Sequence, residues 1–128
     1  MRVLADTNII ISALMFPASV PARALIKAEA EHDLILCEQN IEELRDVLRR
    51  KRPELLPAAE ELLLNLVYEL IPAVNDAGEK MRDVKDQPIL NSAIMFDVDI
   101  IVTGDKDFLC LELERPKIIR PLEFIENY

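Results

Sequence analysis

Short apolar segments, separated by stretches with helical spacing, limit the fold of this chain more than any other feature. Residues 2–5, 34–37 and 99–103 are four or five residues long and mostly apolar. Such a continuous run is typical of a strand buried on both faces, because a strand with one wet face alternates apolar and polar residues. Two further strands are predicted at residues 70–74 and 117–120.

Between the strands, apolar residues recur every three or four positions, which predicts helices. Ser19 and Pro21 form a helix start, because Ser can cap a helix and Pro suits its first turn. Asn40 can cap the next helix, which Pro53 breaks, and a turn is predicted around Gly78 with Asn75 and Asp76. Helices are expected at residues 8–14, 21–32, from 39 or 40 to the break, 58–70, 86–96, 108–112 and 122–125.

Strands that alternate with helices imply a parallel sheet covered by helices on both faces, so the predicted class is α/β, doubly wound. The length of 128 residues is that of one domain, and we expect a single domain over 1–128. Asp6 interrupts the N-terminal apolar stretch before a signal-peptide core could form, and no apolar run spans a bilayer. We therefore expect a cytoplasmic protein, in which Cys37 and Cys110 stay reduced.

The net charge of −9 argues against broad electrostatic attraction to nucleic acid, because such attraction comes mainly from Lys and Arg. Divalent cations held by acidic residues would reverse the local sign. The acidity also fits solvated helix faces. Composition alone is therefore a caution against a nuclease and does not exclude one.

Several carboxylates are predicted to meet at one edge of the sheet. In open α/β sheets, ligands bind outside the carboxyl ends of the strands. Asp6 ends the first strand, and Asp105 follows the strand at 99–103 after one glycine. Glu43 lies in the first half of the helix after the second strand, on the border of its apolar stripe, whereas Glu42 points further towards solvent. Asp86 begins the helix that leads into the strand at 99–103, so it should lie at the same edge.

Four converging carboxylates repel one another unless a cation binds, and hard divalent cations with oxygen ligands are the usual remedy. The sequence therefore predicts Mg²⁺ or Mn²⁺ at Asp6, Glu43, Asp86 and Asp105. A magnesium ion in such a site can activate water and stabilise the leaving oxygen in phosphodiester cleavage. The only histidine, His32, lies in a polar stretch, and no Ser-His-Asp or Cys-His set competes with this interpretation.

Each acidic residue also has a plainer interpretation. Asp6, Asp86 and Asp105 can each be a helix cap, and Asp107 could replace Asp105 in either role. Glu43 could be a solvated helix residue. Four polar residues could orient metal-bound water or a phosphate, although turn and capping bonds explain them equally well. These residues are Thr7, Asn8, Ser12 and Thr103.

Three segments of the chain resemble the PIN domain family, in the same order and at similar spacing. They are VLADTNIIISAL, CEQNIEELRDVL and DVKDQPILNSAIMFDVDIIVTGDKDF, and they extend over nearly all of the chain. The resemblance implies an α/β/α sandwich with a central parallel sheet, Mg²⁺ or Mn²⁺ dependence and hydrolysis of RNA. It places Asp6, Glu43, Asp86 and Asp105 at the four acidic positions of the family pattern.

Two positions depart from that pattern. Cys37 replaces the usual Ser or Thr ahead of the helix, and Gln87 replaces a frequent second acidic residue after Asp86. Neither departure removes an acidic position. Single-domain bacterial and archaeal members are usually toxins of toxin–antitoxin pairs, commonly dimeric and restrained by a protein antitoxin, and the resemblance implies the same here.

The leading hypothesis is a metal-dependent endoribonuclease that acts on single-stranded or loop RNA. Cationic contacts to RNA would come from Arg45, Arg49, Lys51 and Lys106, although a basic helix end is favoured by the helix dipole without any ligand. The alternative is a non-catalytic module that keeps the fold and works through protein contacts or dimerisation. A receiver-like or phosphatase fold with Asp6 as phosphoacceptor is disfavoured, because no adjacent DxD pattern or strand-end Lys accompanies it.

Overall fold

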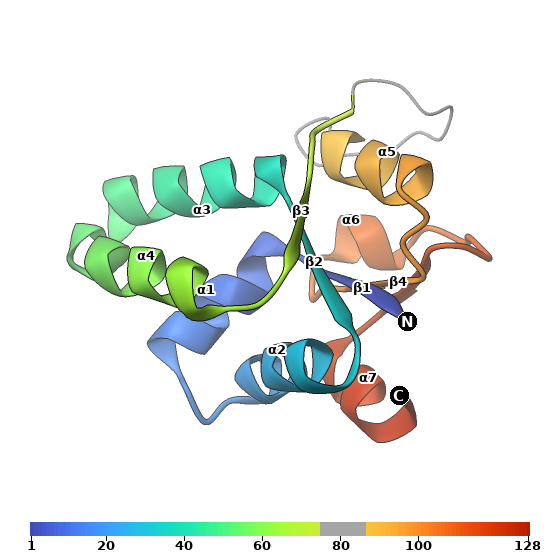
Figure 1. The fold of residues 1–128 in the computed structure, drawn as a ribbon, viewed down its shortest axis with the longest axis horizontal. Coiled ribbons are helices and arrows are strands. Elements are labelled where there is room, and N and C mark those ends of the chain that lie inside the picture. Colours follow the sequence, from blue (N-terminus) through green and yellow to red (C-terminus); the bar gives the residue numbers. More distant parts are fainter. Residues whose placement is uncertain (75–86) are drawn as a thin grey trace.

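Five parallel strands form one sheet in the order β3-β2-β1-β4-β5 (Figure 1). The computed structural model describes residues 1–74 and 87–128. Its strands are β1 (Arg2–Ala5), β2 (Asp33–Cys37), β3 (Glu69–Ile71), β4 (Ile100–Val102) and β5 (Lys117–Ile119). The chain begins at β1 in the middle, proceeds outward to β2 and β3, and then returns to β4 on the other side of β1. The strand order therefore reverses between β1 and β4, which is where ligands bind in sheets of this kind.

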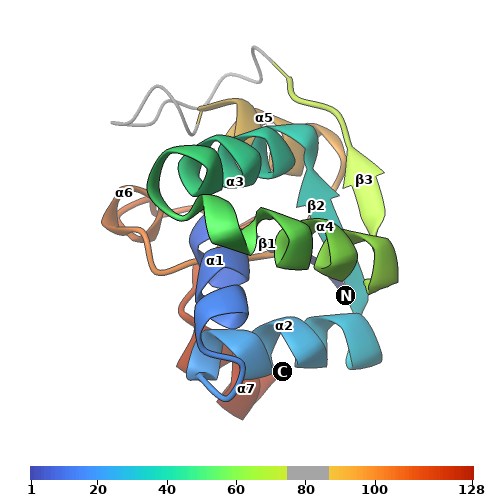
Figure 2. The ribbon, with the colours of Figure 1, turned by 90° about the vertical axis from the view of Figure 1, so that its left-hand side faces the viewer.

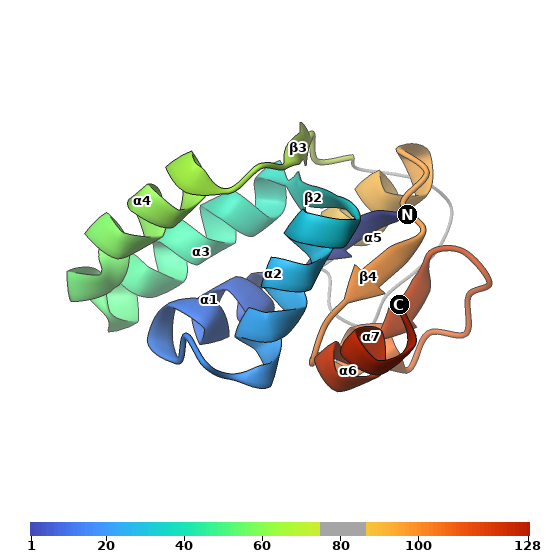
Figure 3. The same cartoon turned by 60° about the horizontal axis from the view of Figure 1, so that its bottom comes forward.

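Helices cover both faces of the sheet, which confirms the predicted α/β class and three-layer arrangement. They are α1 (Thr7–Met15), α2 (Val20–Glu31), α3 (Glu38–Lys51), the 3-10 turn η1 (Pro53–Leu55), α4 (Leu56–Asn65), α5 (Gln87–Met95), α6 (Lys106–Leu109) and α7 (Pro121–Asn127). Helix α1 packs against α2 (Figure 2). Helices α3 and α4 lie side by side (Figure 3).

Alternate residues of each central strand enter two separate cores. On β1, Val3 and Ala5 pack in the core under α1, α2, α3, α4 and α7, whereas Leu4 packs in the core under α5 and α6. All three side chains are at most 2% exposed. The continuous apolar run of β1 thus reflects burial on both faces, as predicted.

The predicted helix at residues 58–70 is wrong over its second half. Helix α4 ends at Asn65, and the backbone is extended again by Leu66. Leu70 and Ile71 instead belong to β3, paired with Leu36 and Cys37 of β2. Over so short a stretch, apolar spacing fits a helix or a strand equally well. Here the backbone groups at the edge of β2 need hydrogen-bond partners, and pairing with β3 supplies them. The strand predicted at 70–74 accordingly begins one residue earlier and ends at Ile71.

Two other local predictions were shifted by capping. Helix α6 begins at Lys106 and not at Phe108, because the Asp105 carboxylate accepts the backbone N–H of Asp107 and starts the helix there. Helix α3 begins at Glu38, so Asn40 lies inside it and is not its N-cap. The turn predicted at 75, 76 and 78 lies outside the described residues.

Both cysteines are free: Cys37 is buried and Cys110 is exposed. Within residues 1–74 and 87–128, no single helix is long and apolar enough to cross a membrane. Helices α1 and α2 meet the criteria of length and composition only as a pair, and the pair is bent by 113°.

Candidate active site

A small cavity of about 180 Å³ opens at the carboxyl edge of the sheet, at the point where the strand order reverses. Three of the predicted acidic residues line it, each from a different part of the chain. Asp6 follows β1, Glu43 lies in α3, and Asp105 follows β4. The remaining lining residues are Thr7, Asn8, Ile11 and Val47.

Asp6 is the most buried of these acids, with only 4% of its surface exposed. Its Oδ1 accepts the backbone N–H of Thr7 at 2.8 Å, so it is the N-cap of α1. Its Oδ2 accepts the hydroxyl of Thr103 at 2.8 Å. The pKa of Asp6 is nevertheless raised from its ordinary 3.8 to about 6. Burial is the largest cause and the charges of Glu43 and Asp105 add to it, while the hydrogen bonds from Thr103 and Thr7 act in the opposite direction.

Thr7 and the fully buried Asn40 connect Asp6 to Glu43. The Thr7 hydroxyl donates to Oε2 of Glu43 at 2.8 Å. The Asn40 amide nitrogen donates to Oγ1 of Thr7 at 3.1 Å and to Oδ1 of Asp6 at 3.4 Å. The amide oxygen of Asn40 accepts the backbone N–H of Cys37 at 3.2 Å. One side chain of α3 therefore contacts both the helix start and the acidic cluster.

Thr103 connects Asp6 to Asp105 in the same way. Its hydroxyl donates to Asp6 and accepts the backbone N–H of Asp105 at 3.0 Å. Oδ1 of Asp105 in turn accepts the backbone N–H of Asp107 at 2.8 Å. Asp105 lines the cavity and Asp107 is not among the lining residues. The geometry favours Asp105 over Asp107 as the acid that faces the cavity.

Not every predicted site residue is brought to the cavity. Ser12 lies further along α1 and does not line it. Asp86 lies outside the described residues. In the part of the chain that the structure describes, no three His, Cys, Asp or Glu side chains are grouped closely enough to hold a metal ion among themselves. The metal site predicted from four acids therefore stays a prediction.

The cations proposed for RNA contact lie on the surface. Arg45 pairs with Glu60 at 2.7 Å, and Arg49 pairs with Asp46 at 2.9 Å, with every partner at least 44% exposed. Exposed pairs of this kind contribute little to stability, so they exchange partners easily. Lys51, at the end of α3, and Lys106, at the start of α6, are also exposed.

The cavity presents oxygen atoms, the kind of ligand that a hard divalent cation prefers. Asp6, Glu43 and Asp105 supply only oxygen atoms, and their like charges repel one another. The Asn8 carbonyl oxygen Oδ1 is buried and has no hydrogen-bond partner among the described residues. Asn8 lines the same cavity as these carboxylates, so its unsatisfied oxygen adds a further oxygen atom beside them.

Sequence reasoning missed the role of Asn40 in this cluster. Its position suggested only the N-cap of a helix. The N-cap is Cys37 instead, and Asn40, at the third position of α3, accepts the backbone N–H of Cys37 with its side-chain oxygen. The signal that could have found it is a polar residue on the buried flank of an amphipathic helix, one turn before Leu44 and two turns before Leu48 of the apolar stripe.

Comparison with known proteins gives one family and one fold. The PIN domain model matches residues 2–107. No curated protein matches the chain. A solved structure of VapBC2 from Rickettsia felis, bound to a DNA fragment from its promoter, superposes with a TM-score of 0.70. The two sequences are 16% identical, and the superposition covers 94% of this chain and 98% of the other.

The match to the family model extends over most of the chain, and the structural likeness shows the same fold independently. PIN domains are generally nucleases. Asp6, Glu43 and Asp105, three of the four acidic positions that the resemblance implied, lie at the carboxyl edge of the sheet. This chain belongs to the PIN domain family.

Proposed function

We propose that this protein is a divalent-metal-dependent endoribonuclease. The observation that carries the proposal is the cavity at the strand-order reversal, where Asp6, Glu43 and Asp105 converge beside the unsatisfied Asn8 oxygen. Membership of the PIN domain family supports a nuclease, and hydrolysis of RNA is the finer step that we add.

Asp6, Glu43 and Asp105 would hold Mg²⁺ or Mn²⁺, with Asp86 as the fourth acidic ligand expected from the sequence and Asp107 as a substitute for Asp105. When bound, such a cation supplies Lewis-acid polarisation of a phosphoryl oxygen and lowers the pKa of water. The protein holds its carboxylates in fixed positions. Thr103 and the Thr7 N–H fix the two oxygens of Asp6, and the Thr7 hydroxyl fixes Glu43.

The substrate that we propose is single-stranded or loop RNA, because an unpaired backbone reaches a small edge cavity more easily than a duplex does. With a net charge of −9, the protein cannot rely on its overall charge to attract RNA. Local contacts would come from the exposed Arg45, Arg49, Lys51 and Lys106, whose present ion pairs are weak.

We further propose that the protein is the toxin of a toxin–antitoxin pair, acts in the cytoplasm and forms a homodimer. The structural neighbour is one half of a VapBC toxin–antitoxin complex, which supports an antitoxin as partner. An apolar groove of about 400 Å³ between α1, α2 and α4 offers a surface for that antitoxin, since exposed apolar grooves of this kind receive amphipathic helices. Leu14, Ile26 and Leu62 are among its lining residues.

The test is cleavage of a mixed panel of RNAs by the purified protein with Mn²⁺, in wild type and three variants. Asp6→Asn should lower the cleavage rate at least about 100-fold, because the charged oxygen that helps to activate water is lost. Glu43→Gln should lower it substantially. Glu42→Gln is the matched control, since Glu42 is the exposed neighbour on the same helix, and it should cleave as the wild type does.

Cleavage that persists unchanged in both Asp6→Asn and Glu43→Gln would exclude this site as its source. A wild-type protein that cleaves none of the RNAs would favour the non-catalytic binding module. Cleavage that depends equally on Glu42 and Glu43 would show that the position of the acids does not matter and that the loss reflects charge alone.

A further inference from the structure

The buried side chain of Asn40 contacts Asp6 directly and is linked to Glu43 through Thr7. It is fully buried in α3. Its amide nitrogen donates to Asp6 and to Thr7, and its amide oxygen accepts the backbone N–H of Cys37. All of its main hydrogen-bonding groups are therefore used, two of them towards the site and one towards its own helix.

From these contacts we infer that Asn40 is a positioning residue, which holds the carboxylates of Asp6 and Glu43 in one fixed arrangement through the hydroxyl of Thr7. The inference rests on the proposed function, because it concerns how the same acids are held for a divalent cation. Asn40 does not line the cavity and is not assigned any contact with substrate.

The orientation of the amide follows from its neighbours. The Cys37 N–H is a donor, so the Asn40 atom that faces it must be the oxygen. The NH₂ group then faces Asp6 and Thr7, where it meets acceptors. A flipped amide would place two donors together at Cys37 and its oxygen against the Asp6 carboxylate. The start of α3 thereby determines which end of Asn40 faces the acids.

The direction of the next hydrogen bond follows from the same reasoning. Oγ1 of Thr7 accepts from the Asn40 amide, so its single proton is free to donate. Glu43 Oε2 receives this proton at 2.8 Å, whereas the alternative acceptor, the Asn40 backbone oxygen, is at 3.4 Å. The chain of donors therefore runs from Asn40 through Thr7 to Glu43, and it ends on a charged acceptor, which makes the last bond its strongest.

Leucine or alanine at position 40 would keep a helix but remove all three contacts, and aspartate would place a carboxylate against Asp6. Only a side chain with an acceptor and a two-proton donor on one short stem satisfies Cys37, Thr7 and Asp6 together. Groups that orient metal ligands in this manner typically change metal affinity by 10–100-fold when they are removed.

The experiment measures Mn²⁺ binding by calorimetry in the full-length protein, in wild type, Asn40→Ala, Thr7→Val and the double variant. Each single variant should weaken Mn²⁺ binding by about 10-fold or more. The double variant should bind little more weakly than the worse single variant, because both residues act on Glu43 along one path. Ser19→Ala is the matched control: it removes the cap of α2, whose hydroxyl accepts the Ala22 N–H, without contact with the cavity.

A residue that merely stabilises the fold would behave differently. Its effect on Mn²⁺ affinity would be reproduced by Ser19→Ala, or would add fully to that of Thr7→Val, and either result would overturn the inference. If Asn40→Ala does not fold, Thr7→Val is the deciding variant. Valine has nearly the same shape as threonine, and Thr7 does not cap α3. Unchanged Mn²⁺ affinity in Thr7→Val would then overturn the inference.

Failure of the proposed function has a separate signature. A wild-type protein that binds Mn²⁺, with an affinity that falls in Asn40→Ala and Thr7→Val but with no cleavage of RNA, supports the inference and contradicts the nuclease. A wild-type protein that binds Mn²⁺ while Asn40→Ala binds it equally well contradicts only the inference. A wild-type protein that binds no Mn²⁺ contradicts both.

Discussion

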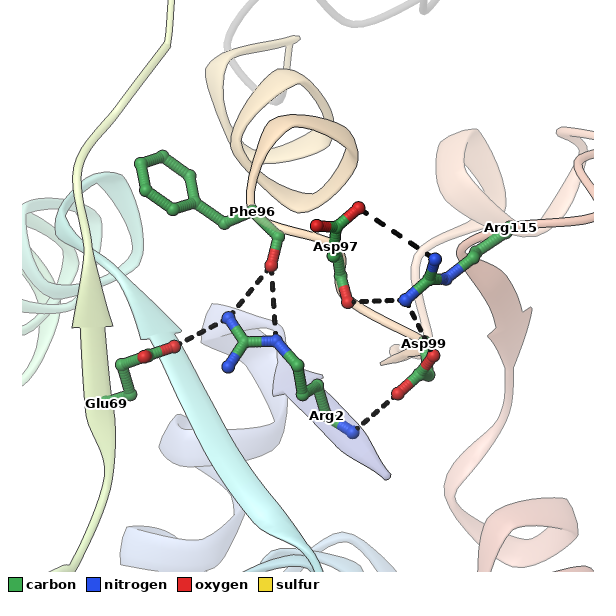
Figure 4. A network of polar contacts seen from close by, with 6 residues as sticks. All are labelled: Arg2, Glu69, Phe96, Asp97, Asp99 and Arg115. Carbon is green, nitrogen blue, oxygen red and sulfur yellow. Dashed lines mark hydrogen bonds and ion pairs between the residues drawn. The ribbon is translucent and has the colours of Figure 1, made fainter.

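Both edges of the sheet carry carboxylate side chains, but those at the amino edge lie beside arginines and those at the carboxyl edge lie beside one another. At the amino edge, Asp99 accepts the backbone N–H of Arg2 at 2.8 Å and the guanidinium of Arg115 at 3.0 Å (Figure 4). Arg2 also pairs with Glu69 at 2.6 Å. The Arg2 N–H first, and then the guanidinium of Arg115, lower the pKa of Asp99.

At the carboxyl edge, the donors that residues 1–74 and 87–128 supply to Asp6 and Glu43 are neutral. Asp6 is bound by Thr7, Asn40 and Thr103, and Glu43 is bound by Thr7. Among the described residues, no Lys or Arg forms an ion pair with either acid. Here the pKa of Asp6 is raised instead of lowered.

The difference separates acids that stabilise the fold from acids that cost stability. The amino edge joins the starts of β1, β3 and β4 through paired charges, as Figure 4 shows. The carboxyl edge accumulates negative charge in a buried position, which is unfavourable unless a cation binds. The charges at the amino edge of the sheet are therefore balanced without a ligand, whereas the negative charges at the carboxyl edge are balanced only when a cation binds.

The largest expected difference between the edges concerns Asp6 in metal-free protein. A pKa of about 6 against an ordinary 3.8 corresponds to roughly 3 kcal/mol of cost for the charged form. Asp6→Asn should therefore raise the free energy of unfolding by about that amount at pH 7.5 in EDTA. Because the folded-state pKa is raised, the wild type becomes more stable as the pH falls from about 6. The difference in the free energy of unfolding between Asp6→Asn and wild type should therefore disappear below about pH 4. Urea denaturation at both pH values measures it; a variant that is less stable than wild type at pH 7.5 would contradict the comparison.

A second prediction sharpens which acid completes the carboxyl edge. Asp105 lines the cavity and Asp107 does not, although both follow β4. Asp105→Asn should reduce Mn²⁺-dependent RNA cleavage by about 10-fold. Removal of a group that supports a metal site typically costs about 10–100-fold, so this is the lower end of that range. Asp107→Asn, the matched control with the same change of charge, should change cleavage less than about 3-fold, well under that range. A larger loss in Asp107→Asn would transfer the role to Asp107.

The smallest expected effect is at the amino edge and has the opposite sign to that of Asp6. Asp99→Asn should lower the free energy of unfolding by about 1 kcal/mol at pH 7, since a charge-assisted hydrogen bond becomes a neutral one. The folded-state pKa of Asp99 is lowered, so its contribution is present above the ordinary pKa and is lost as the pH falls through the folded value. Parallel urea titrations at pH 7 and pH 3 should show the difference shrinking at the lower pH. If Asp99→Asn stabilised the protein at pH 7, the two edges would not differ as described.

The sequence predicted the strands well and the end of one helix poorly. The runs at 2–5 and 34–37 were identified because burial on both faces leaves a local signature of continuous apolar residues. The segment 66–70 has no such signature, and only its pairing with β2 shows that its last residues belong to a strand. Local periodicity does not reveal that pairing, because the paired strand lies more than thirty residues away in the sequence.

The direction of a parallel sheet predicted that Asp6, Glu43, Asp86 and Asp105 gather at one edge, and the structure places Asp6, Glu43 and Asp105 at one cavity there. The choice of Glu43 over Glu42 also came from helix geometry, and the structure places Glu43 at the cavity and leaves Glu42 exposed. Whether these acids bind metal is still a prediction. The connecting residues Asn40 and Thr103 could not be ranked, since a hydrogen bond between neighbouring elements depends on distances of a few tenths of an ångström.

The sequence by itself determined the α/β class, the positions of the central strands and the edge at which the acids gather. It did so because strand burial, helical spacing and the direction of a parallel sheet are properties of short segments and of their order. Only the tertiary structure decided that Asp105 faces the cavity and that Asn40 spans from Cys37 to Asp6. Those outcomes depend on strand register and on the rotation of each helix about its axis, which many contacts determine jointly.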